Sequence, residues 1–191
     1  MKIISTAFTC EKDRGSEYEV GYKWSLILGN ILETLTLTRK SSYLSLKAFE
    51  INHPIYGLVK KINNTYYKSI DLPFIHKLLK GRKYMRIHYI AWIFITTLWI
   101  RINKDKFDIN HHICFVSTWL PPLTFFGGLP FIWGPIGTGS PLPKWALSNN
   151  LYSLIWRIVT QILPSKNLLI KYIASRSQFT IPINSHVENL L

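Results

Sequence analysis

The sequence has few cysteines and few carboxylates, and each scarcity excludes a class of protein. Its 191 residues include two cysteines, Cys10 and Cys114, whose wide separation argues against a disulfide scaffold or a cysteine-based metal site and fits a reducing cytoplasm. Only ten residues are acidic, and none lies between Ile109 and Val187. The second half therefore lacks the paired carboxylates of a glycosidase, and no D-x-D pair is present to hold a metal-bound nucleotide.

Several motifs of nucleotide binding and catalysis are also missing. The chain contains no G-x-G-x-x-G fingerprint, no P-loop and no G-x-S-x-G nucleophile elbow. The longest apolar run, Ile87–Ile100, covers about 14 residues and is too short to span a membrane, which takes roughly 20. It is interpreted as a buried or membrane-surface helix. The short apolar start gives way to charge at Glu11, which is not the pattern of a secretory signal.

Positive charge is abundant. Lysine and arginine number 23 against ten acidic residues, and the net charge is +13. This excess favours an anionic partner, such as a phosphorylated ligand or an anionic membrane surface. The alternative is that lysine-rich usage reflects a biased genome. Basic residues are densest at Lys77–Lys83 and Arg101–Lys106, but no RNA-binding aromatic motif or zinc-finger spacing accompanies them, so nucleic acid is not expected as a partner.

Strand-like and helix-like segments alternate along the chain. Strands are predicted over Lys2–Phe8, Leu35–Thr38, Tyr66–Leu72, Phe107–Val116, Leu129–Trp133 and Phe179–Ile183. Helices are predicted over Glu17–Leu28, Arg82–Asn103, Trp145–Leu163 and Asn167–Ser175, with a short one through Phe125-Phe126. The alternation predicts one α/β domain, residues 1–191, with a Rossmann-like, mostly parallel sheet and helices on both faces.

Ligands of such sheets bind beyond the carboxyl ends of the strands. Three loops, Thr9–Glu17, His111–Pro122 and Trp133–Pro143, are therefore expected to share one edge of the sheet. The first leads into a helix through Gly15 and Ser16, and helix-terminal amides beside a glycine form a natural site for phosphate or hydroxyl groups. An ordinary strand-to-helix turn is the alternative.

Two adjacent histidines, His111 and His112, end the fourth predicted strand. Strand alternation predicts that one faces inward and the other outward or along the strand. A histidine at the carboxyl end of a strand can bind a hydroxyl group or act as a base, whereas a buried, hydrogen-bonded histidine is the alternative. No third ligand stands at metal spacing, so no metal site is predicted.

The segment Trp133–Gly139 contains three glycines, Gly134, Gly137 and Gly139, with a proline between the first two. This composition predicts an irregular backbone wall that another molecule can approach closely. A plain surface loop is the alternative. A tryptophan at the start of an exposed loop favours a functional role.

Three segments resemble, in order and spacing, parts of the family-four glycosyltransferases. The first is Gly15–Trp24; Phe107–Val116 resembles the family's FDLVHHVTFV strand; Pro130–Gly139 resembles its PFIWGPVGGG segment. Arg14 stands where the family has the first glycine of a pair. The resemblance covers nearly the whole chain and is weakest from Arg39 to Lys106.

The resemblance implies a GT-B architecture of two Rossmann-like domains, the first binding the acceptor and the second most of the nucleotide-sugar donor. It implies retention of configuration without an obligatory metal, and a nucleotide-sugar as substrate with no cofactor. It also implies that Gly15 and Ser16 approach the donor phosphates. His112 or His111, with the Trp133–Gly139 segment, would then line the cleft.

The expected function is that of the acceptor-side domain of an enzyme that moves a sugar from a nucleotide-sugar to a glycan or lipid-linked acceptor in surface-polysaccharide synthesis. It would work in the cytoplasm or peripherally on the inner face of the cytoplasmic membrane. The family's donor-binding domain has no counterpart in the 191 residues, so a donor-binding partner protein and an inactive isolated chain are expected. The alternatives are an inactive truncated remnant and a non-catalytic binding subunit. A lone acceptor domain should expose Trp119, Trp133, Pro135 and Trp145.

Overall fold

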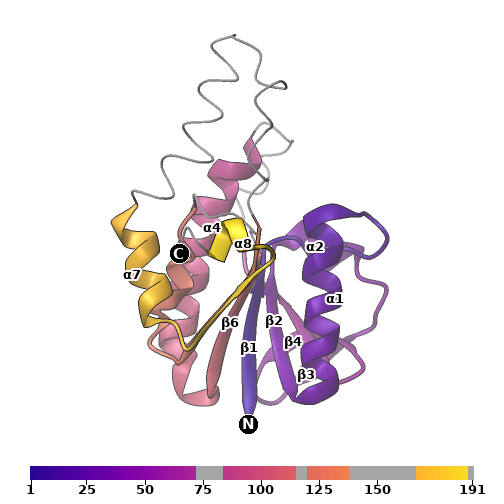
Figure 1. The fold of residues 1–191 in the computed structure, drawn as a ribbon. Coiled ribbons are helices and arrows are strands. Elements are labelled where there is room, and N and C mark those ends of the chain that lie inside the picture. The colour runs from indigo at the N-terminus through magenta and orange to yellow at the C-terminus, as the bar shows by residue number, and fades with distance from the viewer. Residues whose placement is uncertain (72–83, 115–119, 138–166, 189–191) are drawn as a thin grey trace.

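A computed structural model describes residues 1–71, 84–114, 120–137 and 167–188 (Figure 1). Its strands are β1 Lys2–Ala7, β2 Glu33–Thr38, β3 Glu50–His53, β4 Gly57–Ile62, β5 Thr65–Ser69, β6 Ile109–Cys114, β7 Phe131–Ile136 and β8 Phe179–Pro182. Its α-helices are α1 Ser16–Ile31, α2 Lys40–Ser45, α4 Met85–Asn103, α7 Leu168–Arg176 and α8 Ser185–Glu188. Two short 3-10 helices are η2 Lys104–Lys106 and η3 Leu123–Gly127.

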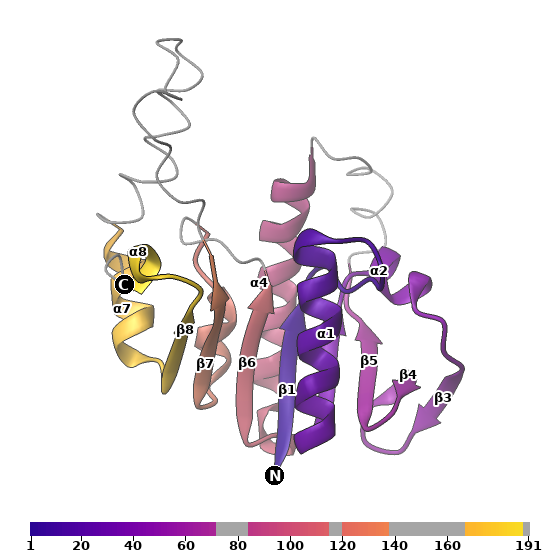
Figure 2. The same ribbon diagram turned by 45° about the vertical axis from the view of Figure 1, so that its right-hand side comes forward.

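The strands form one sheet in the order β3-β4-β5-β2-β1-β6-β7-β8. From β5 to β8 every neighbouring pair is parallel, whereas β3, β4 and β5 pair antiparallel at one edge. Helices α1 and α2 lie on one face of the sheet, and α4 and α7 lie on the other (Figures 1 and 2). The predicted α/β class, a Rossmann-like and mostly parallel sheet with helices on both faces, is confirmed.

The central strand β1 is buried from both sides, which explains its unbroken apolar and small-residue sequence. Ile4 and Phe8, both fully buried, pack toward α4, where Phe8 meets Trp92 edge to face with ring centroids 5.3 Å apart. Ala7, on the opposite face, packs with Ile113 and the residues of α1. Strands buried on both faces in this way are typical of parallel sheets covered by crossover helices.

Helix α1 lies very close to the sheet at two of its glycines. A Cβ atom at Gly21 would overlap the carbonyl oxygen of Thr9, and one at Gly29 would overlap the hydroxyl oxygen of Thr65. The helix therefore continues through Gly29 and ends at Ile31, and the predicted end at Leu28 was wrong. Contact with the neighbouring strand outweighs the low helix propensity of glycine here.

Other element ends are explained by side-chain caps. The side chain of Asn167 accepts hydrogen bonds from the backbone N–H groups of Leu169 and Ile170, and so begins α7 where the sequence predicts a helix. Asn184 accepts a hydrogen bond from the N–H of Val187 at the start of α8. The predicted helix Trp145–Leu163 lies outside the described residues.

The antiparallel edge and the short helix α2 were not predicted. The stretch that follows the predicted strand Leu35–Thr38 is poorly patterned, with Pro54 and Gly57 as breakers. In the structure Gly57, with φ of +71°, begins β4, and Asn63, with φ of +53°, forms the turn between β4 and β5. Asn63-Asn64 is therefore a hairpin turn signal, since asparagine tolerates positive φ. The third predicted strand, Tyr66–Leu72, is shorter in the structure, where β5 ends at Ser69.

None of the helices that the structure describes is both long and apolar enough to cross a membrane. Helix α4 comes nearest in length, with 19 residues from Met85 to Asn103. One of its faces is buried against the sheet through a set that includes Tyr89, Trp92 and Ile100. One face of α4 thus belongs to the core. This agrees with the interpretation of the apolar run Ile87–Ile100 as a buried helix.

Candidate functional site at the carboxyl edge of the sheet

The predicted site segments converge on one edge of the sheet. Strands β1, β6 and β7 are parallel neighbours that end at Ala7, Cys114 and Ile136, so the segments that follow them leave the sheet on the same side. This confirms the shared edge for the described parts of the three loops. Residues 115–119 and 138–143, which include the candidate Gly139, lie outside the described residues.

Gly15 occupies the turn that leads into α1. Its φ of +64° lies in the region that favours glycine, and a Cβ atom there would have no neighbour within 4 Å. The N-cap residue has no side chain to bond this end of α1, and the Glu19 carboxylate accepts a hydrogen bond from the backbone N–H of Gly15. Ser16 is the first residue of the helix. The first amides of a helix are groups that can bind anions.

The two histidines are both buried, on opposite faces of β6. His111, 2% exposed, donates from Nε2 to the carbonyl oxygen of Gly134 at 2.7 Å, and its ring meets Trp24 of α1 edge to face. His112, 1% exposed, lies 2.8 Å from Oγ1 of Thr6 and 3.2 Å from the hydroxyl of Tyr89 in α4. The expected alternation is present, but covering helices bury both faces, so neither ring points to solvent.

Burial decides the protonation of both rings. Removal from water lowers the pKa of His111 to about 4, and removal from water together with the neighbouring His111 lowers the pKa of His112 to about 3. Both imidazoles are therefore neutral near pH 7. In this arrangement they hold strands together by hydrogen bonds.

The Trp133–Gly137 segment belongs to the sheet for most of its length. The predicted loop beginning at Gly134 was wrong, because β7 continues to Ile136. Trp133 is 1% exposed and packs with Ile170 of α7, so the expected exposure of Trp133 and Pro135 was also wrong. Trp119 and Trp145 lie outside the described residues.

The first two glycines of this segment differ in their surroundings. At Gly134, with φ of +139°, a Cβ atom would lie 2.6 Å from the Cβ of Ile181, so glycine is needed for the close approach of β7 and β8. Gly137 follows β7 and is partly exposed. Among the described residues of this segment, Gly137 is the one that lies in a loop, as the sequence predicts.

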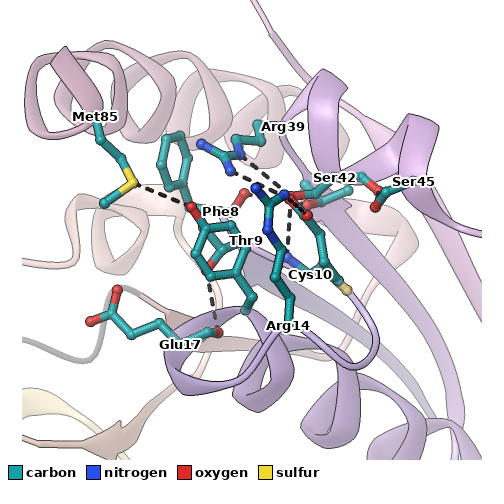
Figure 3. Close-up of polar contacts among 12 residues, drawn as sticks. Phe8, Thr9, Cys10, Arg14, Glu17, Arg39, Ser42, Ser45 and Met85 are labelled. Carbon is teal, nitrogen blue, oxygen red and sulfur yellow. Dashed lines mark hydrogen bonds and ion pairs between the residues drawn. The ribbon is translucent and has the colours of Figure 1, made fainter. Parts of the chain in front are cut away.

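A charged cluster beside Gly15 was missed from the sequence (Figure 3). It consists of Glu11, Arg14, Arg39 and Ser42. The Glu11 carboxylate is buried, 6% exposed, and forms ion pairs with Arg14 and, at 3.4 Å, with Arg39. It also accepts a hydrogen bond from the hydroxyl of Ser42 at 3.0 Å. The cluster joins the first loop to the start of α2, at the carboxyl ends of β1 and β2.

The two arginines of this cluster differ in exposure. The Arg39 side chain is 11% exposed and its guanidinium stacks over the ring of Phe8, 4.9 Å from the centroid. The Arg14 side chain is 63% exposed and lies over the ring of Tyr18, 5.0 Å from the centroid. Arg39 is therefore held from several sides, whereas Arg14 has one face in solvent beside the Gly15 turn. Both are cations at the carboxyl edge of the sheet, and both pair with the Glu11 carboxylate.

A second missed group is the pair Asp71 and His88. Asp71 follows β5, and its Oδ1 lies 2.9 Å from Nε2 of His88 in α4, while its other oxygen accepts a hydrogen bond from the backbone N–H of Lys40. Both side chains are nearly buried. Both residues lie between Arg39 and Lys106, where the family resemblance is weakest, and no sequence motif indicates that they would meet.

A pocket of about 320 Å³ opens beside the charged cluster. Its wall includes Glu11, Asp13 and Tyr22 from the first loop and α1, and Lys47 from the segment after α2. The lining carries charges of both signs and an aromatic ring. Such a lining suits a polar ligand with hydroxyl groups, which can donate to carboxylates and stack on an aromatic face.

Neither a metal centre nor a reactive thiol emerges from the described residues. No group of three or more potential ligands is gathered among them. Cys10 and Cys114 are buried free thiols. Burial raises the pKa of Cys10 to about 12 and also raises that of Cys114, so neither is a thiolate near neutral pH.

Comparison with known proteins adds no family. No protein-family model matches the chain, and no curated protein matches it.

Proposed function

We propose that this chain is the acceptor-side domain of a glycosyltransferase of the GT-B kind, which moves a sugar from a nucleotide-sugar to a glycan or lipid-linked acceptor in surface-polysaccharide synthesis. The fold class is compatible with this proposal. The observation that carries it is the start of α1 at the positive-φ residue Gly15, with Arg14 and Arg39 on the same carboxyl edge. Helix-terminal amides and arginines together suit the phosphates of a nucleotide-sugar.

In this proposal the residues have separate tasks. Gly15 and Ser16 approach the donor phosphates through their backbone, and Arg14, which is largely exposed, adds positive charge. The pocket beside Glu11 and Tyr22 takes hydroxyl groups of the acceptor. His111 and His112 remain neutral and hold β6 in place beneath the site, so they are positioning residues.

The rest of the donor would be bound by a second Rossmann-like domain that faces this edge. We propose that this domain is supplied by a donor-binding partner. The complex would work peripherally on the inner face of the cytoplasmic membrane, where lipid-linked acceptors lie. The nucleotide-sugar is a substrate, and the proposal needs neither a cofactor nor a metal.

A non-catalytic binding subunit is the second candidate. It is favoured by the burial of both histidines, which leaves no solvent-facing base on β6 in this arrangement. Such a subunit would still use the Gly15 turn to bind a phosphorylated ligand. The two candidates differ only in whether sugar is transferred when a donor-binding domain is added.

The binding claim can be tested on the chain alone by NMR titration with pyrophosphate and with uridine or guanosine diphosphate. We expect saturable shifts in the amides of Gly15, Ser16 and Glu17, with weak affinity. Gly15→Ala should weaken binding, whereas Gly57→Ala, which alters another positive-φ glycine on the distant hairpin, should not. Absence of saturable shifts near Gly15 would remove the proposed phosphate contact.

The transfer claim needs the chain together with a donor-binding domain. Release of nucleoside diphosphate from a panel of nucleotide-sugars would be measured with a lipid-linked acceptor present. Transfer that needs both components supports the enzyme. Phosphate binding without transfer supports the binding subunit, and neither activity favours an inactive remnant.

A further inference from the structure

One face of α4 is apolar and turned away from the protein. Five large side chains recur along it at spacings of three or four residues: Ile87, Ile90, Phe94, Leu98 and Ile102, with exposures of 57%, 50%, 58%, 46% and 81%. Residues three, four and seven apart share one side of an α-helix, so these side chains form a continuous ridge. We call this set the α4 ridge. From Ile87 to Ile102 it extends about 22 Å at 1.5 Å per residue.

The opposite face of the same helix is already used by the core. Tyr89, Trp92 and Ile100 are buried against the sheet. The ridge is therefore not needed to hold α4 in place. A surface helix of a water-facing domain usually carries polar residues on its outer side, so an apolar outer side marks a contact surface.

The charges around the α4 ridge indicate which kind of partner surface it can contact. Helix α4 contains no acidic residue. At its carboxyl end Arg101, Lys104 and Lys106 are exposed, and the exposed acids that follow the helix are Asp105 and Asp108. Among the described residues, no carboxylate forms an ion pair with Arg101 or Lys104. An apolar strip bordered by cations complements the boundary between acyl chains and anionic headgroups.

Shape and length agree with this partner. Exposed side chains on the outer face of a single helix can enter between lipid headgroups, whereas a groove would be needed to receive a partner helix. No described helix can cross a membrane, so α4 would lie in the plane of the interface. Figure 1 shows α4 on the side of the sheet opposite α1, so this contact would not cover the Gly15 turn from the α1 side.

We propose that the α4 ridge is the surface by which this protein lies on an anionic membrane. The inference deepens the proposed function, on whose membrane location it rests, and identifies the contacting face. The apolar side chains enter the interface, and the exposed cations at the carboxyl end of α4 meet anionic headgroups.

The test is co-sedimentation of the full 191-residue chain with phosphatidylcholine vesicles that contain 30 mol%, or no, phosphatidylglycerol. We expect binding to the anionic vesicles that weakens as salt is raised. Ile90→Gln/Phe94→Gln/Leu98→Gln should lower the partition coefficient by about 100-fold, from roughly 1 kcal/mol for each partly inserted side chain. Arg101→Gln/Lys104→Gln should lower it by about tenfold or more, and only with the anionic vesicles.

The matched control is Ile27→Gln/Ile31→Gln/Leu44→Gln. These side chains are 49%, 69% and 61% exposed, and they lie on α1 and α2, on the other side of the sheet. The control should bind vesicles as the unaltered chain does. Circular dichroism and urea unfolding would establish that each variant is folded.

A second measurement reports the contact directly. An environment-sensitive fluorophore placed at Leu98→Cys should shift to the blue on vesicle binding, while the same fluorophore at Ile31→Cys should not. The native thiols are buried and compete little for the label.

Equal vesicle binding by the ridge variant and the unaltered chain would overturn the proposal, and so would an equal loss in the α1 and α2 control. Self-association that the ridge variant abolishes, without vesicle binding, would assign the ridge to a second copy instead. Vesicle binding is measured without any sugar donor. Failure of transfer would therefore leave this result intact, and failure of binding would leave the phosphate titration intact.

Discussion

His112 and Thr6 are joined by a hydrogen bond of 2.8 Å between Nδ1 and Oγ1, which links β6 to β1 on the α4 side of the sheet. Both side chains are buried. We expect Thr6→Val, which keeps the shape and removes the hydroxyl, to lower the free energy of unfolding by about 1 to 2 kcal/mol. Urea unfolding monitored by circular dichroism would measure it. Thr180→Val, at a partly exposed site in β8, is the control and should change little.

Stability should fall in mildly acidic solution because of the two buried histidines. Their folded-state pKa values, about 4 for His111 and about 3 for His112, lie below the ordinary value of 6.5. Between these values the unfolded chain binds protons that the folded chain does not, so the free energy of unfolding decreases as the pH falls. The slope approaches about 2.7 kcal/mol per pH unit when both histidines contribute fully.

The measurement is urea unfolding at several pH values between 7.5 and 4.5. Comparison with His111→Asn/His112→Asn, where the double variant folds, isolates the contribution of the two rings. The variant should show a flatter dependence on pH over this range. An unchanged slope in the variant would mean that other groups cause the acid sensitivity.

The charged cluster predicts unequal effects for its two arginines. Arg39→Gln removes the largely buried cation that pairs with the buried Glu11 carboxylate. It should lower the free energy of unfolding by about 2 to 4 kcal/mol. Arg14→Gln removes a largely exposed partner and should change stability by less than about 1 kcal/mol. Urea unfolding of the two variants side by side tests this. Equal losses would show that exposure does not distinguish the two pairs.

Gly29→Ala should destabilise the fold although alanine is the better helix former. The added methyl group overlaps the Thr65 hydroxyl, and overpacking of this kind costs about 1 to 3 kcal/mol. The double variant Gly29→Ala/Thr65→Ala should recover part of the loss, because the overlapping oxygen is gone. A double-mutant cycle on thermal or urea unfolding measures this coupling. Additive losses would contradict the close contact.

The isolated 191-residue chain is expected to show no multiple turnover with any nucleotide-sugar. The described edge offers amides and arginines for phosphates, but the proposal assigns the base and sugar of the donor to a second domain. A coupled assay for released nucleoside diphosphate checks this. Robust turnover by the purified chain would refute the division of labour between two domains.

The fold class could be predicted from the sequence because the hydrophobic pattern of strands and helices is clear in the parallel part of the sheet. Glycine and proline residues mark the ends of these elements. The strand Lys2–Phe8 is rich in apolar, β-branched and small residues, as central strands need to be, and Asn167 caps a helix that the sequence predicts. The hairpin of β3 and β4 could not be predicted in the same way. Its strands lie at the exposed sheet edge, where alternation is weak, and its first strand is largely exposed.

The site was predicted less well than the fold. The sequence indicated the edge correctly, since strand order determines which loops meet. It left open whether His111 and His112 face the site or are buried, and in the structure α1 and α4 cover the two rings on opposite faces of β6. The sequence also could not show that Glu11 and Arg39, 28 residues apart, form an ion pair, because no local pattern links the loop after β1 to the loop after β2.

The two glycine contacts of α1 have a consequence for the open turn at its start. Gly21 rests against the backbone of Thr9, and Gly29 rests against Thr65 of β5. A helix held at two points two turns apart can neither slide along the sheet nor roll upon it without steric overlap. The height of the Gly15 amides above the strand ends is therefore determined by residues as distant as Thr65, and enlarging either glycine would displace the proposed phosphate site.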